Sequence, residues 1–150
     1  MKVPSMSSPT DYVRVCRVSD VPDPGNGNDF YITDFSSRQL PGQQLDVAAP
    51  GSWVVGPYQV NGQLSWYYLS GTSMASPHVA GVAALMLQKN STLLPSDIEN
   101  ILKTTALALP PGCRSVINPD TGSAENVCWG ANATGAGVIQ ADMALAAVQP

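Results

Sequence analysis

The chain has 150 residues, enough for one domain with a sizeable hydrophobic core. Its formal net charge is −4, and no run of lysine or arginine occurs that would suit nucleic acid or acidic lipid. No apolar stretch reaches the roughly 18 residues that a membrane span needs. The start, MKVPSMSSPT, has no apolar segment of the signal-peptide type. We therefore expect no nucleic acid and no membrane as a partner, and no signal peptide in this chain.

The first part of the chain predicts short strands separated by turns. Residues 20–29, rich in proline and glycine, predict a loop. The aromatic-rich stretch 52–69 is expected to be irregular, with a turn at Asn61-Gly62. Period-two alternation or short apolar runs between turns indicate three candidate strands, at 13–18, 30–35 and 45–51.

The pattern changes at Met74, because almost every residue from there to Leu87 is apolar or small. A helix that is apolar on all sides is a buried central helix, and we expect this one to reach about Lys89. Pro77 falls within its first two turns, where the loss of one N–H is tolerated best.

Two further helices are predicted after the central one. Ser96 and Glu99 have the spacing of a capping box, with Ser96 as the N-cap of a second helix. The third helix is expected over 139–148, after the glycine-rich GAGV.

Three cysteines leave the pairing open. Cys113 and Cys128 flank a polar stretch rich in turn residues, and a bridge would close a loop of about 15 residues, worth about 3 kcal/mol. Cys16, in the alternating stretch YVRVCRV, is expected to be a buried small hydrophobic residue. The alternative is three reduced thiols. No CxxC or HxxxH spacing supports a zinc site.

One stretch is specific enough to indicate a family. GTSMASPHVAGVAAL (71–85) resembles, almost letter for letter, the active-site serine signature of the subtilases, the subtilisin-like serine peptidases. DFSSRQLPGQQLDVAAPG (34–51) resembles the segment that precedes this serine in the family. GAGVIQADMALAAV (135–148) resembles the family's closing helix. The resemblance covers most of the chain from about Tyr12 onward.

The resemblance implies an α/β, three-layer fold with a parallel sheet and a central serine-bearing helix. It implies a serine endopeptidase that hydrolyses peptide bonds of polypeptide substrates through an acyl-enzyme on Ser73. It also implies an extracellular or secreted location. No cofactor is expected. Structural calcium is possible for the family, but we expect the acidic residues before Ser73 to be solvated loop charges.

Elementary chemistry agrees with this role for Ser73. The unpaired N–H groups and the positive dipole end at a helix N-terminus favour a developing oxyanion, and the Ser73 N–H would be one donor. Gly71 and Thr72 would let the chain turn sharply and expose the hydroxyl. Neither G-x-S-x-G nor S-x-x-K fits this stretch. The plainer alternative is that Ser73 only caps a core helix.

His78 is the only histidine in the chain and follows Ser73 by five residues. On a helix this spacing is a rotation of about 140° and an advance of about 7.5 Å, so the ring points away from the hydroxyl. The resemblance implies structural roles for Gly71, Thr72, Pro77 and His78. We therefore expect that His78 is not the general base.

The groups that would activate Ser73 are missing from the sequence. The order Asp, His, Ser in subtilisin places both partners before the serine, and no histidine precedes Ser73. The family's oxyanion asparagine, in A-G-N-x-G, is absent as well. None of the preceding aspartates has the D-[ST]-G context of the catalytic one; they are Asp11, Asp20, Asp23, Asp29, Asp34 and Asp46.

We therefore expect residues 1–150 to be the C-terminal half of a subtilase catalytic domain, inactive without the missing N-terminal half. Three interpretations stay open. The chain is a piece of a secreted endopeptidase, or one half of a split protease whose other chain supplies Asp and His, or a non-catalytic interaction or structural module. The upstream nucleotide sequence would separate them, because the first interpretation requires the missing motifs in frame.

Overall fold

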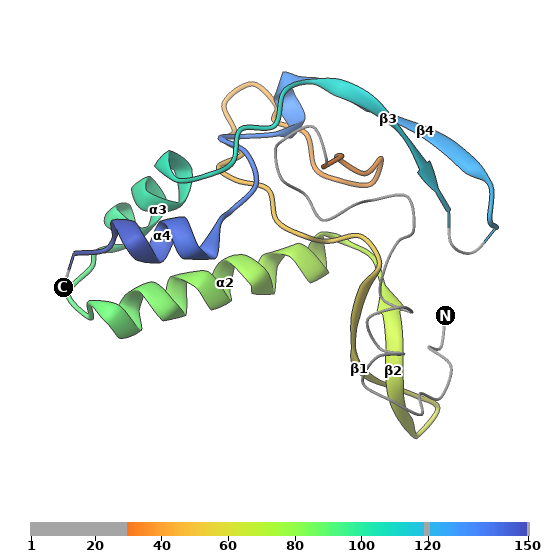
Figure 1. Ribbon diagram of the computed structural model, residues 1–150, viewed down its shortest axis with the longest axis horizontal. Helices are drawn as coiled ribbons and strands as arrows, with labels where there is room; N and C mark the ends of the chain where they lie inside the picture. Colours follow the sequence, from red (N-terminus) through yellow and green to blue (C-terminus); the bar gives the residue numbers. More distant parts are fainter. Residues whose placement is uncertain (1–29, 119–120, 150) are drawn as a thin grey trace.

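The computed structural model describes residues 30–118 and 121–149, and within them the chain forms two β-hairpins and a group of helices (Figure 1). The predicted strand at 13–18, the predicted loop at 20–29 and Cys16 lie outside the described residues. The elements are β1 (Val54–Val60), β2 (Gln63–Leu69), α2 (Thr72–Lys89), α3 (Pro95–Thr104), β3 (Gly112–Ile117), β4 (Ala124–Trp129), the 3₁₀ turn η2 (Ala131–Ala133) and α4 (Ala141–Ala147).

The sheets of the described residues differ from the expected parallel sheet. Both are two-stranded and antiparallel, with β1 beside β2 and β3 beside β4. The candidate strand at 45–51 contributes one bridge residue, Ala48, which pairs in parallel with Val138. A parallel sheet needs several aligned strands joined by crossover connections. Among the described residues, parallel pairing is limited to the single bridge between Ala48 and Val138.

The stretch 30–35 does not form the predicted strand but ends in a turn. The Ser36 N–H donates to the Thr33 carbonyl at 3.2 Å, and the Arg38 guanidinium donates to the carbonyls of both residues. The Asp34 carboxylate accepts from the Phe35 N–H at 2.9 Å. Side chains here satisfy backbone groups that a strand would have paired with a neighbour.

Residues 52–69, expected to be irregular, contain the β1–β2 hairpin. The register runs from Val54 opposite Leu69 to Val60 opposite Gln63. The predicted turn at Asn61-Gly62 is confirmed, with φ of 51° and 77° at its two residues. Positive φ at both positions is the requirement of a type I′ turn, whose twist matches that of the flanking strands.

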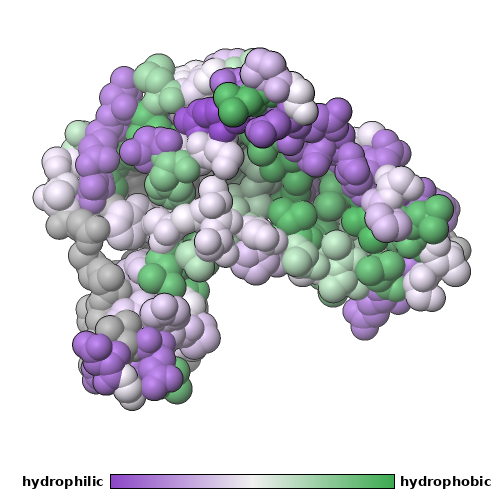
Figure 2. All heavy atoms as spheres, turned by 180° about the vertical axis from the view of Figure 1, so that it is seen from behind, coloured by the Kyte–Doolittle hydropathy of each residue, from purple (hydrophilic) through white to green (hydrophobic). Residues whose placement is uncertain are grey.

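Helix α2 confirms the predicted central helix and ends at Lys89 as expected. It is nevertheless covered on one side only, by α4 and α3 (Figure 1). Met86 is fully buried, whereas Leu85 is 45% exposed and Leu87 is 38% exposed. The expectation of burial on all sides is therefore wrong for the described residues, because no described element packs against the outer side of α2. Hydrophobic side chains reach the surface over the helical part (Figure 2).

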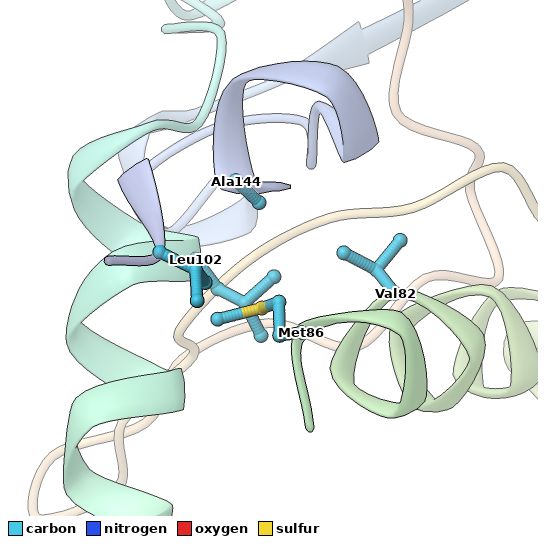
Figure 3. Close-up of a cluster of buried hydrophobic side chains, with 5 residues drawn as sticks. Val82, Met86, Leu102 and Ala144 are labelled. Carbon is cyan, nitrogen blue, oxygen red and sulfur yellow. The ribbon is translucent and has the colours of Figure 1, made fainter. Parts of the chain in front are cut away.

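The main core lies where α2, α3 and α4 meet. Met86 and Val82 of α2 face Leu102 of α3 and Ala144 of α4 (Figure 3). A second cluster is formed by residues outside the longer helices and the strands. Its buried members are Ile32, Leu109, Ala133 and Val138. Helix α4 confirms the third predicted helix but starts at Ala141, because the backbone of its N-cap Gln140 is extended, with φ of −123° and ψ of 109°.

Helix α3 starts one residue before the expected N-cap Ser96, so the predicted capping box is wrong. The N-cap is Leu94, whose N–H donates to the Asp97 carboxylate at 2.9 Å. Pro95 occupies the first helical position, where its fixed φ and missing N–H suit a helix start. Glu99 instead lies 3.2 Å from the Lys103 ammonium, one turn along the same helix.

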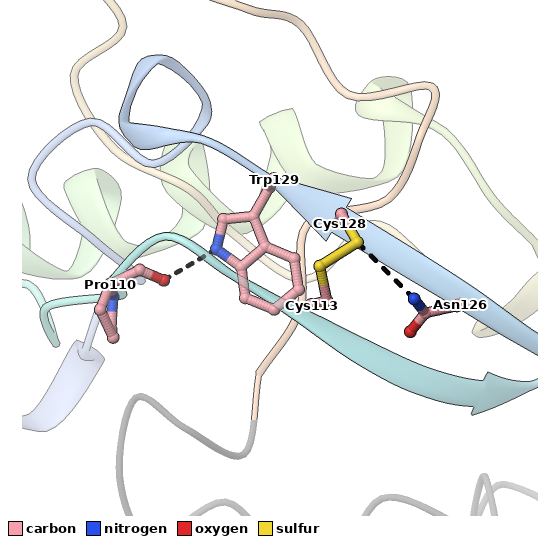
Figure 4. Close-up of a disulfide and its surroundings, with 5 residues drawn as sticks. All are labelled: Pro110, Cys113, Asn126, Cys128 and Trp129. Carbon is pink, nitrogen blue, oxygen red and sulfur yellow. Dashed lines mark hydrogen bonds between the residues drawn. A yellow bond between two sulfur atoms is a disulfide. The ribbon is translucent and has the colours of Figure 1, made fainter.

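The disulfide between Cys113 and Cys128 is confirmed (Figure 4). The two residues are directly opposite each other on β3 and β4, with their Cα atoms 4.0 Å apart. The intervening stretch is a hairpin and not the expected polar loop. Beside the bridge, the Trp129 indole N–H donates to the Pro110 carbonyl at 2.9 Å, which ties the base of this hairpin to the chain that leads into β3.

Candidate active site

Ser73 is the second residue of α2, which confirms its predicted place at a helix N-terminus. The side chain is exposed. The Met74 N–H donates to the Gly71 carbonyl at 3.0 Å and closes the first turn. The first N–H groups of a helix have no acceptor within it, and they carry the positive end of the helix dipole. The site therefore offers an accessible hydroxyl beside backbone donors suited to a negative oxygen.

The turn before Ser73 depends on two glycines. Gly71 has a φ of 154°, a conformation that side-chain-bearing residues rarely adopt. Its N–H donates to the Gly51 carbonyl at 2.8 Å. A Cβ at position 51 would lie 2.9 Å from the Gly71 carbonyl oxygen and 3.2 Å from the Ala75 Cβ. The segment 45–51 can thus lie directly against the first turn of α2 only because residue 51 lacks a side chain.

The structure does not bring His78 to Ser73. The His78 Nδ1 lies 2.8 Å from the Met74 carbonyl oxygen of the preceding turn, and the ring is exposed on the helix surface. Among the residues that the structure describes, no hydrogen bond joins the Ser73 hydroxyl to an imidazole or a carboxylate. The geometry agrees with a supporting role of His78 in the helix.

The two candidate aspartates within the described part of the chain, Asp34 and Asp46, have other partners. Asp34 accepts from the Phe35 N–H in the turn already described. Asp46 is a loop residue whose side chain is 45% exposed, and its carboxylate lies 3.1 Å from the Lys103 ammonium. The remaining candidates lie outside the described residues, at Asp11, Asp20, Asp23 and Asp29.

The Asp46 pair is a feature that sequence reasoning missed. Lys103 donates to Asp46 and to Glu99, and these hydrogen bonds, the one to Asp46 first, raise the pKa of the lysine above its usual value. The Ala136 N–H also donates to the Asp46 carbonyl. The partners are 57 residues apart, so no local pattern could have indicated the contact.

Neither a metal site nor a membrane helix is found in the described residues. No group of three or more His, Cys, Asp or Glu side chains within 30–118 and 121–149 is arranged to hold a metal ion. No helix in that part of the chain is long and apolar enough to cross a membrane.

Comparison with known proteins decides the family. The sequence model of the subtilase family matches residues 5–137 of the chain. This chain belongs to the subtilase family. It is therefore a member of the subtilisin-like serine peptidases by homology. Ser73 and its flanking glycines lie within the matched region.

Two curated relatives and one solved structure agree with this assignment. An extracellular protease of Xanthomonas campestris pv. campestris is 38% identical over 111 residues, which are 71% of this chain and 16% of that protein. Subtilisin DY of Bacillus licheniformis is 52% identical over 68 residues, 45% of this chain and 24% of that protein. The structure of a protease from Pseudoalteromonas arctica PAMC 21717 matches with a TM-score of 0.52 and 32% identity, over 70% of this chain and 30% of that one.

These likenesses establish a subtilisin-like fold for the matched part of the chain. The chain spans about a sixth of the length of the Xanthomonas protease and about a quarter of that of subtilisin DY. Each comparison thus relates the chain to a portion of a larger protease.

Proposed function

We propose that this chain is the serine-bearing part of a subtilisin-like endopeptidase catalytic domain, with Ser73 as the nucleophile. The observation that carries the proposal is the position of Ser73, exposed at the N-terminus of α2, within the signature GTSMASPHVAG. Polypeptides are the proposed substrates. A location outside the cell is proposed because the relatives include an extracellular protease.

The proposed reaction is acyl transfer. The Ser73 hydroxyl attacks the carbonyl carbon of the scissile peptide bond while a histidine from outside this chain takes its proton. The carbonyl oxygen becomes an oxyanion, for which the Ser73 N–H is the proposed donor in this chain. The histidine then protonates the leaving amine, and water releases the acyl group from Ser73.

By itself the chain is proposed to be inactive. A serine at its ordinary pKa is a weak nucleophile and needs an adjacent base. In subtilisin, loss of the histidine costs about 10⁶ in turnover. Loss of the oxyanion asparagine alone costs about 10²–10³ there. Since the chain carries neither group in the family's sequence context, the proposal is that residues outside it supply both.

The uncovered side of α2 is where we place the rest of the catalytic domain. Leu85 and Leu87 are exposed there, together with the small residues Ala80, Gly81 and Ala84. Small residues let a second layer approach the helix backbone closely. The parallel bridge between Ala48 and Val138 supports the further proposal that a parallel sheet of the complete three-layer domain continues from this edge.

A fluorophosphonate probe, which reacts only with an activated serine, tests the proposal. The 150-residue chain is treated alone and after mixing with a polypeptide that carries the family's D-[ST]-G segment, its catalytic histidine and its A-G-N-x-G segment. We expect labelling in the mixture only, and none with S73A. Labelling of the chain alone would mean that it contains a base of its own. Binding without labelling would favour the non-catalytic interaction module.

A further inference from the structure

Trp53 adopts a backbone conformation that is rare for a residue with a bulky side chain. Its φ is 53°, in the left-handed region. Such a conformation persists only where the surrounding structure holds it, and it is concentrated at functional sites. Trp53 follows the Gly51-Ser52 turn and immediately precedes β1. The contacts that hold it therefore indicate what this turn does.

The main contact of Trp53 is with the residue three positions before the nucleophile. The Trp53 N–H donates to the Ser70 Oγ at 2.8 Å, across 17 residues of sequence. The indole packs edge-on against the Tyr68 ring, with ring centroids 6.4 Å apart. The Ser52 hydroxyl lies 3.1 Å from the Tyr31 hydroxyl. The turn is thus held from both of its sides.

A second bond lies beside the first. The Gly71 N–H donates to the Gly51 carbonyl at 2.8 Å. Two hydrogen bonds therefore join residues 51 and 53 to residues 70 and 71, directly before α2. We call these four residues, Gly51, Trp53, Ser70 and Gly71, the clamp. Without the clamp, the conformation of the chain just before α2 would depend on Gly71, whose backbone is the least restricted of any residue.

We infer that the clamp positions the Ser73 hydroxyl, and that Ser70 is a positioning residue which acts through the Gly71 turn. This inference rests on the proposed role of Ser73. A nucleophile must lie about 3–3.5 Å from the reacting carbon, and a displacement of about 1 Å can cost 10²-fold in rate. The hydrogen bond from the Trp53 N–H to the Ser70 hydroxyl both orients the Ser70 side chain and holds Trp53 in its strained conformation.

The first test uses amide hydrogen exchange in the 150-residue chain. S70A removes the acceptor of the Trp53 N–H, so we expect faster exchange at Trp53 and at Gly71. S70T keeps a hydroxyl and should retain protection at both amides. S65A makes the same substitution within β2, outside the clamp, and should leave both amides unchanged. Equal exchange of Trp53 and Gly71 in S70A and wild type would overturn the inference.

The second test measures the rate constant of fluorophosphonate labelling in the mixture with the second polypeptide, at saturation. We expect S70A to label about 10–100-fold more slowly, with an unchanged dissociation constant for the second polypeptide. S70T should recover the rate, and S65A should match wild type. Recovery by S70T distinguishes positioning from a general loss of packing. A wild-type rate in S70A would overturn the inference.

A further variant covers the case in which S70A does not fold. W53G keeps the N–H donor and accepts φ of 53° without strain, so we expect Gly71 to stay protected and the labelling rate to follow the protection at Gly71. Slow labelling of W53G with full protection at Gly71 would mean that the indole, and not the clamp, positions the Ser73 hydroxyl. That result would overturn the inference. Absence of labelling in wild type would instead contradict the proposed function, and the exchange experiment would still decide whether the clamp exists.

Discussion

The Lys103 ammonium lies 3.1 Å from the Asp46 carboxylate, across 57 residues of sequence. Lys103 is on α3, and Asp46 is in the segment that continues to Gly51. Gly51 in turn accepts a hydrogen bond from Gly71, two residues before Ser73. The ion pair thus links α3 to the segment 46–51, and that segment contacts the turn that precedes Ser73.

The first prediction concerns this ion pair. Hydrogen bonds to Asp46 and then Glu99 raise the pKa of Lys103. A raised lysine pKa stabilises the folded state at every pH below the ordinary value of about 10.4, and the contribution is lost as pH rises through the higher folded value. K103M should therefore unfold at lower urea concentration than wild type at pH 7. The two midpoints should converge above about pH 10.5. A difference that stays constant to pH 11.5 would contradict the assignment.

The second prediction concerns the main core. Met86 is fully buried between α2, α3 and α4, so M86A should lower the free energy of unfolding by about 2–5 kcal/mol. L85A on the uncovered side of the same helix should change it by less than about 0.5 kcal/mol. Urea unfolding followed by circular dichroism measures both. A comparable loss in L85A would show that the outer side of α2 is covered within the chain.

The third prediction concerns the disulfide. Cys113 and Cys128 are separated by 15 residues, and a bridge across such a loop contributes about 3 kcal/mol in the chain-entropy model. The double variant C113A/C128A should lose about this amount. Dithiothreitol should shift the unfolding of wild type by a similar amount and leave the double variant unchanged. The contribution would be refuted if the reductant had no effect on wild type.

The fourth prediction concerns the close approach of Gly51 to α2. In G51A the new Cβ would meet the Gly71 carbonyl at 2.9 Å, so the segment must move, at a cost of about 1–3 kcal/mol. G56A is the matched control, because a Cβ at position 56 has no neighbour within 4 Å among the described residues. Thermal unfolding should separate the two variants. Equal melting temperatures would mean that the loop yields without cost.

Much of the local structure, and the position of the candidate nucleophile, could be predicted from the sequence. The run of small and apolar residues predicted α2 and its end at Lys89. Asn61-Gly62 predicted a turn because both positions require positive φ. The signature placed Ser73 at the helix start. Each of these features depends on hydrogen bonds and dihedral preferences within a few residues, so a short stretch of sequence determines it.

Only the tertiary structure decided which neighbours each segment has. Residues 30–35 were a candidate strand, but Asp34 and Arg38 satisfy that backbone in a turn. Ser96 and Glu99 had the spacing of a capping box, yet Pro95 starts the helix and Glu99 pairs with Lys103. Composition predicted burial on every side of α2, whereas the described elements cover one side.

The same distinction holds at the candidate site. The residue types that make the turn, Gly71, Thr72 and Ser73, are contiguous and could be recognised in the sequence. The bonds that support the turn come from Gly51 and Trp53, which are about 20 residues earlier. The sequence by itself therefore determined the helix, its first turn and the identity of the candidate nucleophile. Contacts between distant segments depend on how the whole chain packs, so only the tertiary structure decided what holds that nucleophile in place.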